Sequence, residues 1–364
     1  MYPPYWVSSK EGTFQKSGIR FLYIFQRKEG VIMTKKELIK SVLKGKKPNH
    51  IPYSMWTHMP GIDLDPVKIT QKTVEFYKKY DIDIIKTMNN GMYSCEDFGA
   101  KVDYADVLTG GVAKVVSTPV NKGEDWENIK EAPIDQGALK REQKYLSLLL
   151  EELKGEEVPI IFTVFSPITT ANKLCEDRIQ EFVKEGYGKQ IHHALQKITN
   201  TTCKLVEKVI EMGADGIFFA TQMSNYSVCS EEFYAEFGAP YDIRVLKASK
   251  GWCNVLHAHG NDIMFDLLKD YPVQIFNYHA WQSLPSMEEA AIFTNKTLMC
   301  GIERMNITNH KKNEIRQEIF ESIKQTHGKK LILAPGCVIR YPLDDDMLSY
   351  IKKVKVEIEQ TIVK

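Results

Sequence analysis

Short apolar segments recur along the chain from about residue 50, and each is followed by a longer amphipathic segment. The apolar segments are rich in Val, Ile, Leu and Phe and mostly lack polar alternation, which is typical of strands buried on both faces of a parallel sheet. The predicted strands span residues 50–56, 81–88, 158–165, 214–221, 253–259, 272–279, 297–302 and 330–336. The predicted helices span residues 66–80, 139–153, 189–212, 230–250, 261–269, 286–293, 313–326 and 344–361. This alternation predicts a single α/β domain with the (β/α)8 TIM-barrel fold, and an open doubly wound sheet is the alternative.

The stretch from residue 99 to residue 133 departs from the alternation. The segments KVDYADV (101–107) and GVAKVVSTPV (111–120) are typical of the two arms of a β-hairpin that turns near Thr109-Gly110-Gly111. We expect this inserted β-hairpin to lie across the barrel. Because the chain has no internal repeat and no Pro/Ser-rich linker, we predict one domain over residues 33–364.

Composition and motif content argue against several classes of function. The net charge of +1 favours neither nucleic acid nor an anionic membrane as a partner. The chain contains no run of about 18 apolar residues, so no membrane span is predicted. The seven cysteines are scattered without a CxxC pair, which is typical of a protein of the reducing cytoplasm. The chain also lacks the glycine-rich phosphate-binding motifs and the GxSxG motif of serine hydrolases.

The first 32 residues show neither a helical nor a strand period, and they lack the apolar core of a signal peptide. The first predicted helix follows Met33, where Thr34 can cap it. Arg27-Lys28-Glu29-Gly30 is also what a purine-rich ribosome-binding sequence would encode if translated. Two hypotheses follow: either Met33 is the biological start, or residues 1–32 form a disordered extension. N-terminal sequencing of the native protein distinguishes them.

Two histidines at the end of the fifth predicted strand indicate a metal site. His257 and His259 are two residues apart, so on a strand their side chains face the same side. That spacing provides half of a zinc site, and Cys337, just past the last strand, can supply a third ligand. Three protein ligands leave an open position, which a Lewis-acid zinc ion needs. The alternative is that one histidine bonds the backbone and the cysteine is merely buried.

Other side chains are expected at the same mouth of the barrel, where strands end. His279 ends the sixth predicted strand and could bind the metal, act as an acid or base, or contact substrate, but local hydrogen bonds would explain it equally well. Aromatic and methionine side chains after the first two strands would form a wall for a planar ligand, although core packing or a structural role also explains them. The predicted catalytic residues are His279, Tyr93 and His58, and the predicted cofactor-contacting residues are Trp56, Met59 and Met92.

Several segments together resemble the uroporphyrinogen decarboxylase superfamily. They are EMGADGIFFATQ, EEFYAEFGAPYDIRVL, VLHAHGNDIMFDLLKDYPVQIFNYHAW, GIERM and ILAPGCVI, all in the second half of the chain. KPNHIPYSMW and DIDIIKTMNNGMYSCEDFGAKVDY match more loosely in the first half. Their order and spacing, over nearly the whole chain from about residue 34, carry the resemblance.

The resemblance implies one of two chemistries. In the decarboxylases, an arginine-bearing segment follows the first strand, an aspartate follows the second, and a histidine follows the eighth. Here Trp56-Thr57-His58, Asn89-Asn90 and Cys337 stand in those places. A substrate with eight carboxylates is electrostatically disfavoured without the arginine clamp.

The chain resembles more closely the zinc methyltransferase relatives, which bind zinc through a His-x-Cys and a later Cys. His257 and Cys337 match two of these ligands, and His259 stands in place of the middle cysteine. The resemblance implies an enzyme that moves methyl groups between a small substrate and a corrinoid carrier protein. With one thiolate fewer, the zinc would be more electrophilic, which favours demethylation of a small methylated compound over activation of a bound thiol.

Two further hypotheses remain open. One is a metal-free, decarboxylase-like enzyme in which His257, His259 and His279 act as acids, bases and hydrogen-bond donors. The other is a non-catalytic protein that binds a corrinoid or tetrapyrrole. The sequence leaves the oligomeric state open, with a homodimer as the candidate assembly.

Overall fold

The computed structural model describes residues 33–106 and 113–362. Thr34–Lys364 forms one compact unit, to which the following description refers. The predicted N-terminal extension over residues 1–32 and the predicted hairpin turn near residues 109–111 lie outside the described residues.

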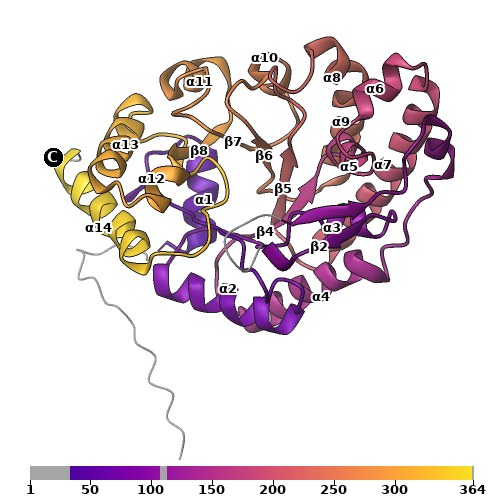
Figure 1. The fold of residues 1–364 in the computed structure, drawn as a ribbon. Helices are drawn as coiled ribbons and strands as arrows, with labels where there is room; N and C mark the ends of the chain where they lie inside the picture. The colour runs from indigo at the N-terminus through magenta and orange to yellow at the C-terminus, as the bar shows by residue number, and fades with distance from the viewer. Residues whose placement is uncertain (1–32, 107–112, 363–364) are drawn as a thin grey trace, which may run out of the picture. The chain divides into compact units, whose positions relative to one another are not determined.

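Seven parallel strands form a curled sheet inside a layer of helices (Figure 1). Their order is β1-β4-β5-β6-β7-β8-β9, so consecutive strands are neighbours apart from the excursion between β1 and β4. The strands are β1 (Ile85–Lys86), β4 (Ile160–Phe165), β5 (Gly216–Thr221), β6 (Val255–Ala258), β7 (Ile275–Tyr278), β8 (Thr297–Ile302) and β9 (Leu331–Pro335). Every residue of these strands is buried, as their apolar composition predicts. The register pairs His257 of β6 with Asn277 of β7.

Residues 51–57 lie between the two edge strands of this sheet. On one side, Ser54 N donates to Leu333 O at 2.9 Å and Leu333 N donates to Pro52 O at 2.8 Å. On the other side, Asp83 N donates to Tyr53 O at 2.8 Å. The predicted strand over residues 50–56 forms isolated β-bridges and no regular ladder, since Pro52 has no N–H to donate.

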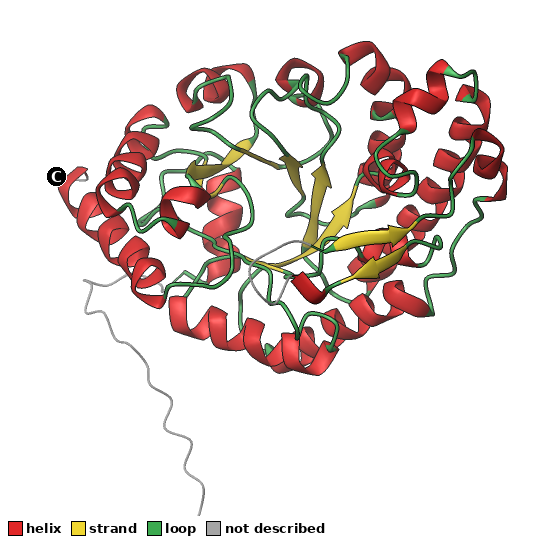
Figure 2. Ribbon diagram, in the orientation of Figure 1, coloured by secondary structure: helices red, strands yellow, loops and turns green. Residues whose placement is uncertain are grey.

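Fourteen helices are found in the described part of the chain, and those that follow the strands cover the outside of the sheet (Figure 2). They are α1 (Lys35–Leu43), α2 (Pro66–Tyr80), α3 (Tyr93–Glu96), α4 (Gly137–Glu152), α5 (Pro167–Lys173), α6 (Ile179–Lys184), α7 (Gly188–Glu211), α8 (Glu231–Phe237), α9 (Ala239–Ala248), α10 (Phe265–Leu268), α11 (Met287–Phe293), α12 (Arg304–Thr308), α13 (Lys312–Gln325) and α14 (Asp345–Ile362). A 3₁₀ helix, η2, spans Gly123–Asn128.

Local sequence signals explain several helix boundaries. Thr34 caps α1 as predicted: Glu37 N donates to its hydroxyl, and the Glu37 carboxylate accepts from Thr34 N. The single helix predicted over 230–250 is instead the pair α8 and α9, because Gly238 and Pro240 interrupt the helical hydrogen bonds. The short helices α5, α6 and α12 were not predicted.

In the stretch from residue 99 to residue 133, β2 (Lys101–Asp103) and β3 (Lys114–Ser117) form an antiparallel pair. Each of these strands lies in one of the two segments that the sequence predicts as hairpin arms. All seven cysteines are free. Among the helices of the described residues, none has the length and apolar character needed to cross a membrane.

Candidate metal centre and cavity

Four side chains from three strand ends converge at one point. His257 lies in β6 and His259 directly follows it, His279 follows β7, and Cys337 follows β9. Each offers one possible ligand atom, and these atoms all lie within 4.8 Å of one another. The Cys337 Sγ lies 3.5 Å from the His259 Nδ1. Tetrahedral zinc bonds to nitrogen and sulfur place ligand atoms about 3.3–3.8 Å apart, so the separation of the Cys337 and His259 atoms fits a shared zinc ion.

The ring orientation of His257 is set by Asn277, its partner across the β6–β7 ladder. The Asn277 amide donates its hydrogens to the carbonyl oxygens of Met299 and Pro335. Its Oδ1 therefore accepts a hydrogen bond from His257 Nδ1 at 2.5 Å. This fixes the proton on Nδ1, so Nε2 keeps its lone pair, as a metal ligand requires.

A similar relay orients His279. The Gln282 Nε2 donates to Glu303 Oε1 at 2.7 Å, which turns the Gln282 Oε1 toward His279. The His279 Nδ1 donates to that oxygen at 3.0 Å. The opposite nitrogen, His279 Nε2, is buried and has no hydrogen-bond partner among the described residues. A buried acceptor without a donor is costly, and a metal ion at the cluster would satisfy it.

Gly336 lets Cys337 reach the histidines. A Cβ at this position would lie 2.8 Å from His279 Cα and 3.1 Å from Tyr278 O. Those are backbone atoms, so any larger residue would push the loop after β9 away from the loop after β7. The close approach of the two loops thus requires glycine and brings the Cys337 thiol to the cluster.

The electrostatics of the cluster favour ligand forms of these residues. Burial would raise the pKa of the Cys337 thiol, but the adjacent rings of His257, His259 and His279 hold that pKa well below its usual value. Burial also lowers the pKa of His257, although Cys337 opposes this effect, so the ring is neutral at pH 7. A thiolate and neutral imidazoles are the forms that bind metal.

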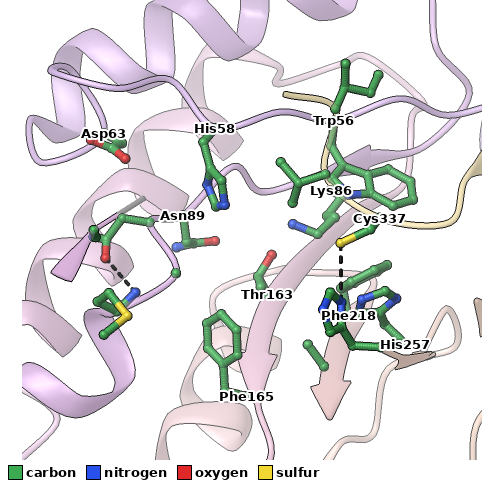
Figure 3. A pocket seen from close by; sticks show the side chains of 18 of the residues that line it. Trp56, His58, Asp63, Lys86, Asn89, Thr163, Phe165, Phe218, His257 and Cys337 are labelled. Carbon is green, nitrogen blue, oxygen red and sulfur yellow. Dashed lines mark hydrogen bonds between the residues drawn. The ribbon is translucent and has the colours of Figure 1, made fainter. Parts of the chain in front are cut away.

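The cluster opens onto a cavity of about 300 Å³ at the ends of the strands (Figure 3). Of the predicted site residues, Trp56, His58 and Met92 line it together with His257, His259 and Cys337. Met59 and Tyr93 are described and buried, but neither lines this cavity. The Tyr93 hydroxyl donates to Thr163 O at 2.6 Å, so its hydrogen is occupied by a backbone acceptor.

Sequence reasoning missed Lys86, a buried lysine in β1. Its ammonium lies 4.9 Å from the centre of the Phe218 ring and donates to Thr87 O at 3.1 Å. Figure 3 shows its side chain in the pocket beside Cys337. Burial lowers the pKa of Lys86 to about 7, while Cys337 opposes this shift. A lysine inside a strand predicted to be buried on both faces was the available signal, and the same holds for Asn277 in β7.

His58, on the opposite wall, is a weaker base than usual. Burial lowers its pKa to about 4, and the charge of Lys86 acts in the same direction. Its ring is therefore neutral near pH 7. Figure 3 shows the ring pointing into the cavity between Asp63 and Lys86.

Solved structures share this fold. A methyltransferase from Methanosarcina mazei superposes with a TM-score of 0.76 at 17% identity, over 90% of this chain and 99% of that one. A B12-independent methionine synthase from Shewanella sp. W3-18-1 gives a TM-score of 0.53 at 13% identity, over 86% of this chain and 95% of that one. At these identities, the likeness shows the fold alone.

Sequence comparisons identify relatives. The methylcobamide:CoM methyltransferases MtbA of Methanosarcina mazei and Methanosarcina acetivorans are each 27% identical over 150 residues. The match covers 40% of this chain and 43% of each relative, so it spans less than half of their length. The family model of uroporphyrinogen decarboxylase (URO-D) matches residues 34–350. Since that match covers most of the chain, the protein belongs to the uroporphyrinogen decarboxylase family.

Proposed function

We propose that this protein is a zinc-dependent methyltransferase that moves methyl groups between a small substrate and a corrinoid carrier protein. The observation that carries the proposal is the cluster of three histidines and Cys337, in which the buried His279 Nε2 has no partner among the described residues. The relatives whose names specify methylcobamide:CoM methyltransferases support the reaction class. We also propose that residues 33–364 form one barrel domain in which residues 51–57 occupy the eighth strand position.

Each part of the site has a role in this proposal. His257, His259, His279 and Cys337 would hold the zinc ion, while Asn277 and Gln282 keep two of the imidazoles in the ligand tautomer. Bound zinc lowers the pKa of a thiol or polarises the atom that a methyl group leaves. The side chains of Trp56, Phe165 and Phe218 exclude water around the substrate.

The cavity size assigns places to the two reactants. A volume of about 300 Å³ is at the small end of ligand pockets and suits a small substrate. A whole corrinoid is much larger, so the carrier protein would present its cobalt at the mouth of the barrel. Transfer of a methyl group leaves the electron pair of the broken bond on the atom that the methyl group leaves. The cavity volume also weighs against a protein whose only task is to bind a tetrapyrrole inside the barrel.

Metal analysis tests the site. We expect about one zinc per chain, by plasma mass spectrometry of protein purified without a histidine tag. The variants His259→Ala and Cys337→Ala should lose it, whereas Cys203→Ala, in α7, should keep it. A folded, metal-free wild type would contradict the zinc proposal. Release of carbon dioxide from a cyclic carboxylate by that metal-free protein would favour the decarboxylase alternative.

Methyl transfer is then measured with free methylcobalamin in place of the carrier protein. The spectrum of methylcobalamin should change when a small thiol accepts its methyl group, and the zinc-free Cys337→Ala variant should be inactive. Zinc-loaded protein that turns over neither thiols with methylcobalamin nor methylated donors with cob(I)alamin would contradict the proposed reaction. A cytoplasmic location and a homodimer also remain predictions, which cell fractionation and size-exclusion chromatography would test.

A further inference from the structure

The loop after β1 carries a buried donor that the metal cluster does not use. Asn90 lines the cavity, and its side chain is only 2% exposed. Its Oδ1 accepts a hydrogen bond from Met92 N at 2.9 Å. A flipped amide would place two donors face to face there, so the orientation is fixed. The other end, Asn90 Nδ2, is buried and has no acceptor among the described residues.

A lysine lies against the same loop. Lys173, the last residue of α5, donates from Nζ to Gly91 O at 3.0 Å and also lines the cavity. Its ammonium lies 4.9 Å from the centre of the Phe165 ring. Within residues 33–106 and 113–362, no carboxylate forms an ion pair with Lys173. An ammonium has three donor hydrogens, so Lys173 retains capacity for an acceptor in the cavity.

Basic side chains outnumber acidic groups around the cavity. Its described lining includes the four basic side chains Lys86, Lys173, Arg304 and Arg340 against two acidic groups, the Asp63 carboxyl and the Cys337 thiol. Burial raises the pKa of Asp63 to about 6, which weakens its charge further near neutral pH. A cavity with low-dielectric walls and a surplus of positive charge attracts anions.

We propose that Asn90 and Lys173 bind the oxyanion group, a carboxylate or a sulfonate, of the small substrate. The substrate is then a short bifunctional molecule, with its oxyanion at the loop after β1 and its thiol or methyl-bearing atom at the cluster around Cys337. Figure 3 shows Asn89, beside Asn90, and Cys337 on different sides of the same pocket. The identity of the reacting group of the substrate rests on the proposed function. The binding of its oxyanion group rests on Asn90 and Lys173 alone.

Calorimetry with small ions tests the oxyanion site without methyl transfer. The chain as purified is titrated with butyrate, propane-1-sulfonate and uncharged 1-butanol. We expect the two oxyanions to bind at least roughly tenfold more tightly than the alcohol, because charge-assisted hydrogen bonds favour them. The tighter of the two ions identifies the natural group as carboxylate or sulfonate.

Variants locate the site. Asn90→Asp keeps the acceptor for Met92 N but replaces the free donor by a negative oxygen, and Lys173→Met keeps the length of the side chain without its charge. Each should weaken oxyanion binding by roughly tenfold or more, with unchanged zinc content. The control Lys184→Met removes an exposed lysine from α6 and should bind as the wild type. Lys173→Met keeps the test decisive if Asn90→Asp fails to fold.

Three results would overturn this inference: no preference over 1-butanol, unchanged binding in both variants, or loss of binding only in Lys86→Met. The last would place the anion beside Cys337. Failure of the proposed function is distinguishable, because oxyanion binding that depends on Asn90 and Lys173 but is accompanied by no methyl transfer would refute the reaction and keep the oxyanion site. Methyl transfer without oxyanion binding that depends on Asn90 and Lys173 would keep the reaction and refute the oxyanion site.

Discussion

Replacement of Asn277 by leucine is expected to weaken zinc binding although Asn277 does not touch the metal cluster's ligand atoms. The Asn277 Oδ1 holds the proton of His257 on Nδ1, at 2.5 Å. Leucine has a similar size but no acceptor, so His257 can place its proton on Nε2, where the zinc would bind. Loss of such a partner typically weakens metal affinity about 10–100-fold, or about 1.4–2.7 kcal/mol.

The same substitution also destabilises the fold, and this cost must be separated from the metal effect. It leaves the His257 Nδ1–H and the carbonyls of Met299 and Pro335 without their partner. A buried unpaired group costs about 1–3 kcal/mol, so we expect the free energy of unfolding of the metal-free protein to fall by at least about 2 kcal/mol.

Asn254 provides a matched control at the opposite end of the same sheet. Its Oδ1 accepts from Ile217 N at 3.1 Å and from the Ser249 hydroxyl at 2.7 Å, and its Nδ2 donates to Gly251 O at 2.9 Å. Asn254→Leu should therefore destabilise the fold by a similar amount while zinc affinity is unchanged. Urea unfolding measures the first effect, and competition with a chromogenic chelator measures the second. Equal zinc affinities of the two folded variants would refute the argument that Asn277 prepares His257 for metal.

Three further predictions concern the loops and the titrating groups. Gly336→Ala should reduce zinc content, since its Cβ would meet His279 Cα at 2.8 Å. The control Gly188→Ala should keep its zinc, because the new Cβ would lie 3.6 Å from the nearest side-chain atom. Normal zinc content in both variants would contradict the steric argument. In metal-free protein, Cys337 should be the first cysteine that iodoacetamide alkylates at pH 7, because its pKa is held below the usual value while burial raises that of Cys95 to about 11; equal reaction of the two, by peptide mass mapping, would contradict this. The His58 pKa is lowered by burial to about 4, so its stabilising contribution is complete above pH 6.5 and is lost as the pH falls toward 4. Between pH 7 and pH 4, the free energy of unfolding should therefore fall by up to about 3 kcal/mol more in the wild type than in His58→Phe, as measured by urea titration. Equal falls in the two proteins would refute this role of His58.

The sheet was predictable because its strands are buried on both faces. A mostly apolar run such as IIFTVF, which is β4, is typical of a strand buried on both faces, and its alternation with amphipathic helices indicates a parallel α/β arrangement. The edges were less predictable. Residues 51–57 exchange backbone hydrogen bonds with Leu333 of β9 and accept one from Asp83, just before β1. β1 itself has only two residues, where the sequence predicted strands of seven and eight.

The metal ligands were predictable to the extent that strand geometry fixes them. Two histidines two residues apart at the end of β6 face one side where the chain stays extended, which brought His257 and His259 into the prediction together. The approach of Cys337 depends on contact between Gly336 and the backbone of His279, which strand spacing does not contain. The direction of Tyr93 was equally hidden, because only the fold shows that its hydroxyl bonds to a backbone carbonyl.

The ligand set also bears on the charge of the substrate. A divalent zinc ion with three neutral imidazoles and the single Cys337 thiolate would keep one positive charge, and the Lys86 side chain lies in the same pocket (Figure 3). Two unit charges about 6 Å apart interact by about 3 kcal/mol at an effective dielectric constant of 20, which corresponds to roughly 100-fold discrimination against a cationic group. In methylation of cob(I)alamin by zinc-loaded protein, the anion (methylthio)acetate and neutral dimethyl sulfide should therefore be better donors than tetramethylammonium. A preference for tetramethylammonium would mean that the cavity neutralises this charge with an acidic group, and it would refute both this argument and the anionic substrate inferred from Asn90 and Lys173.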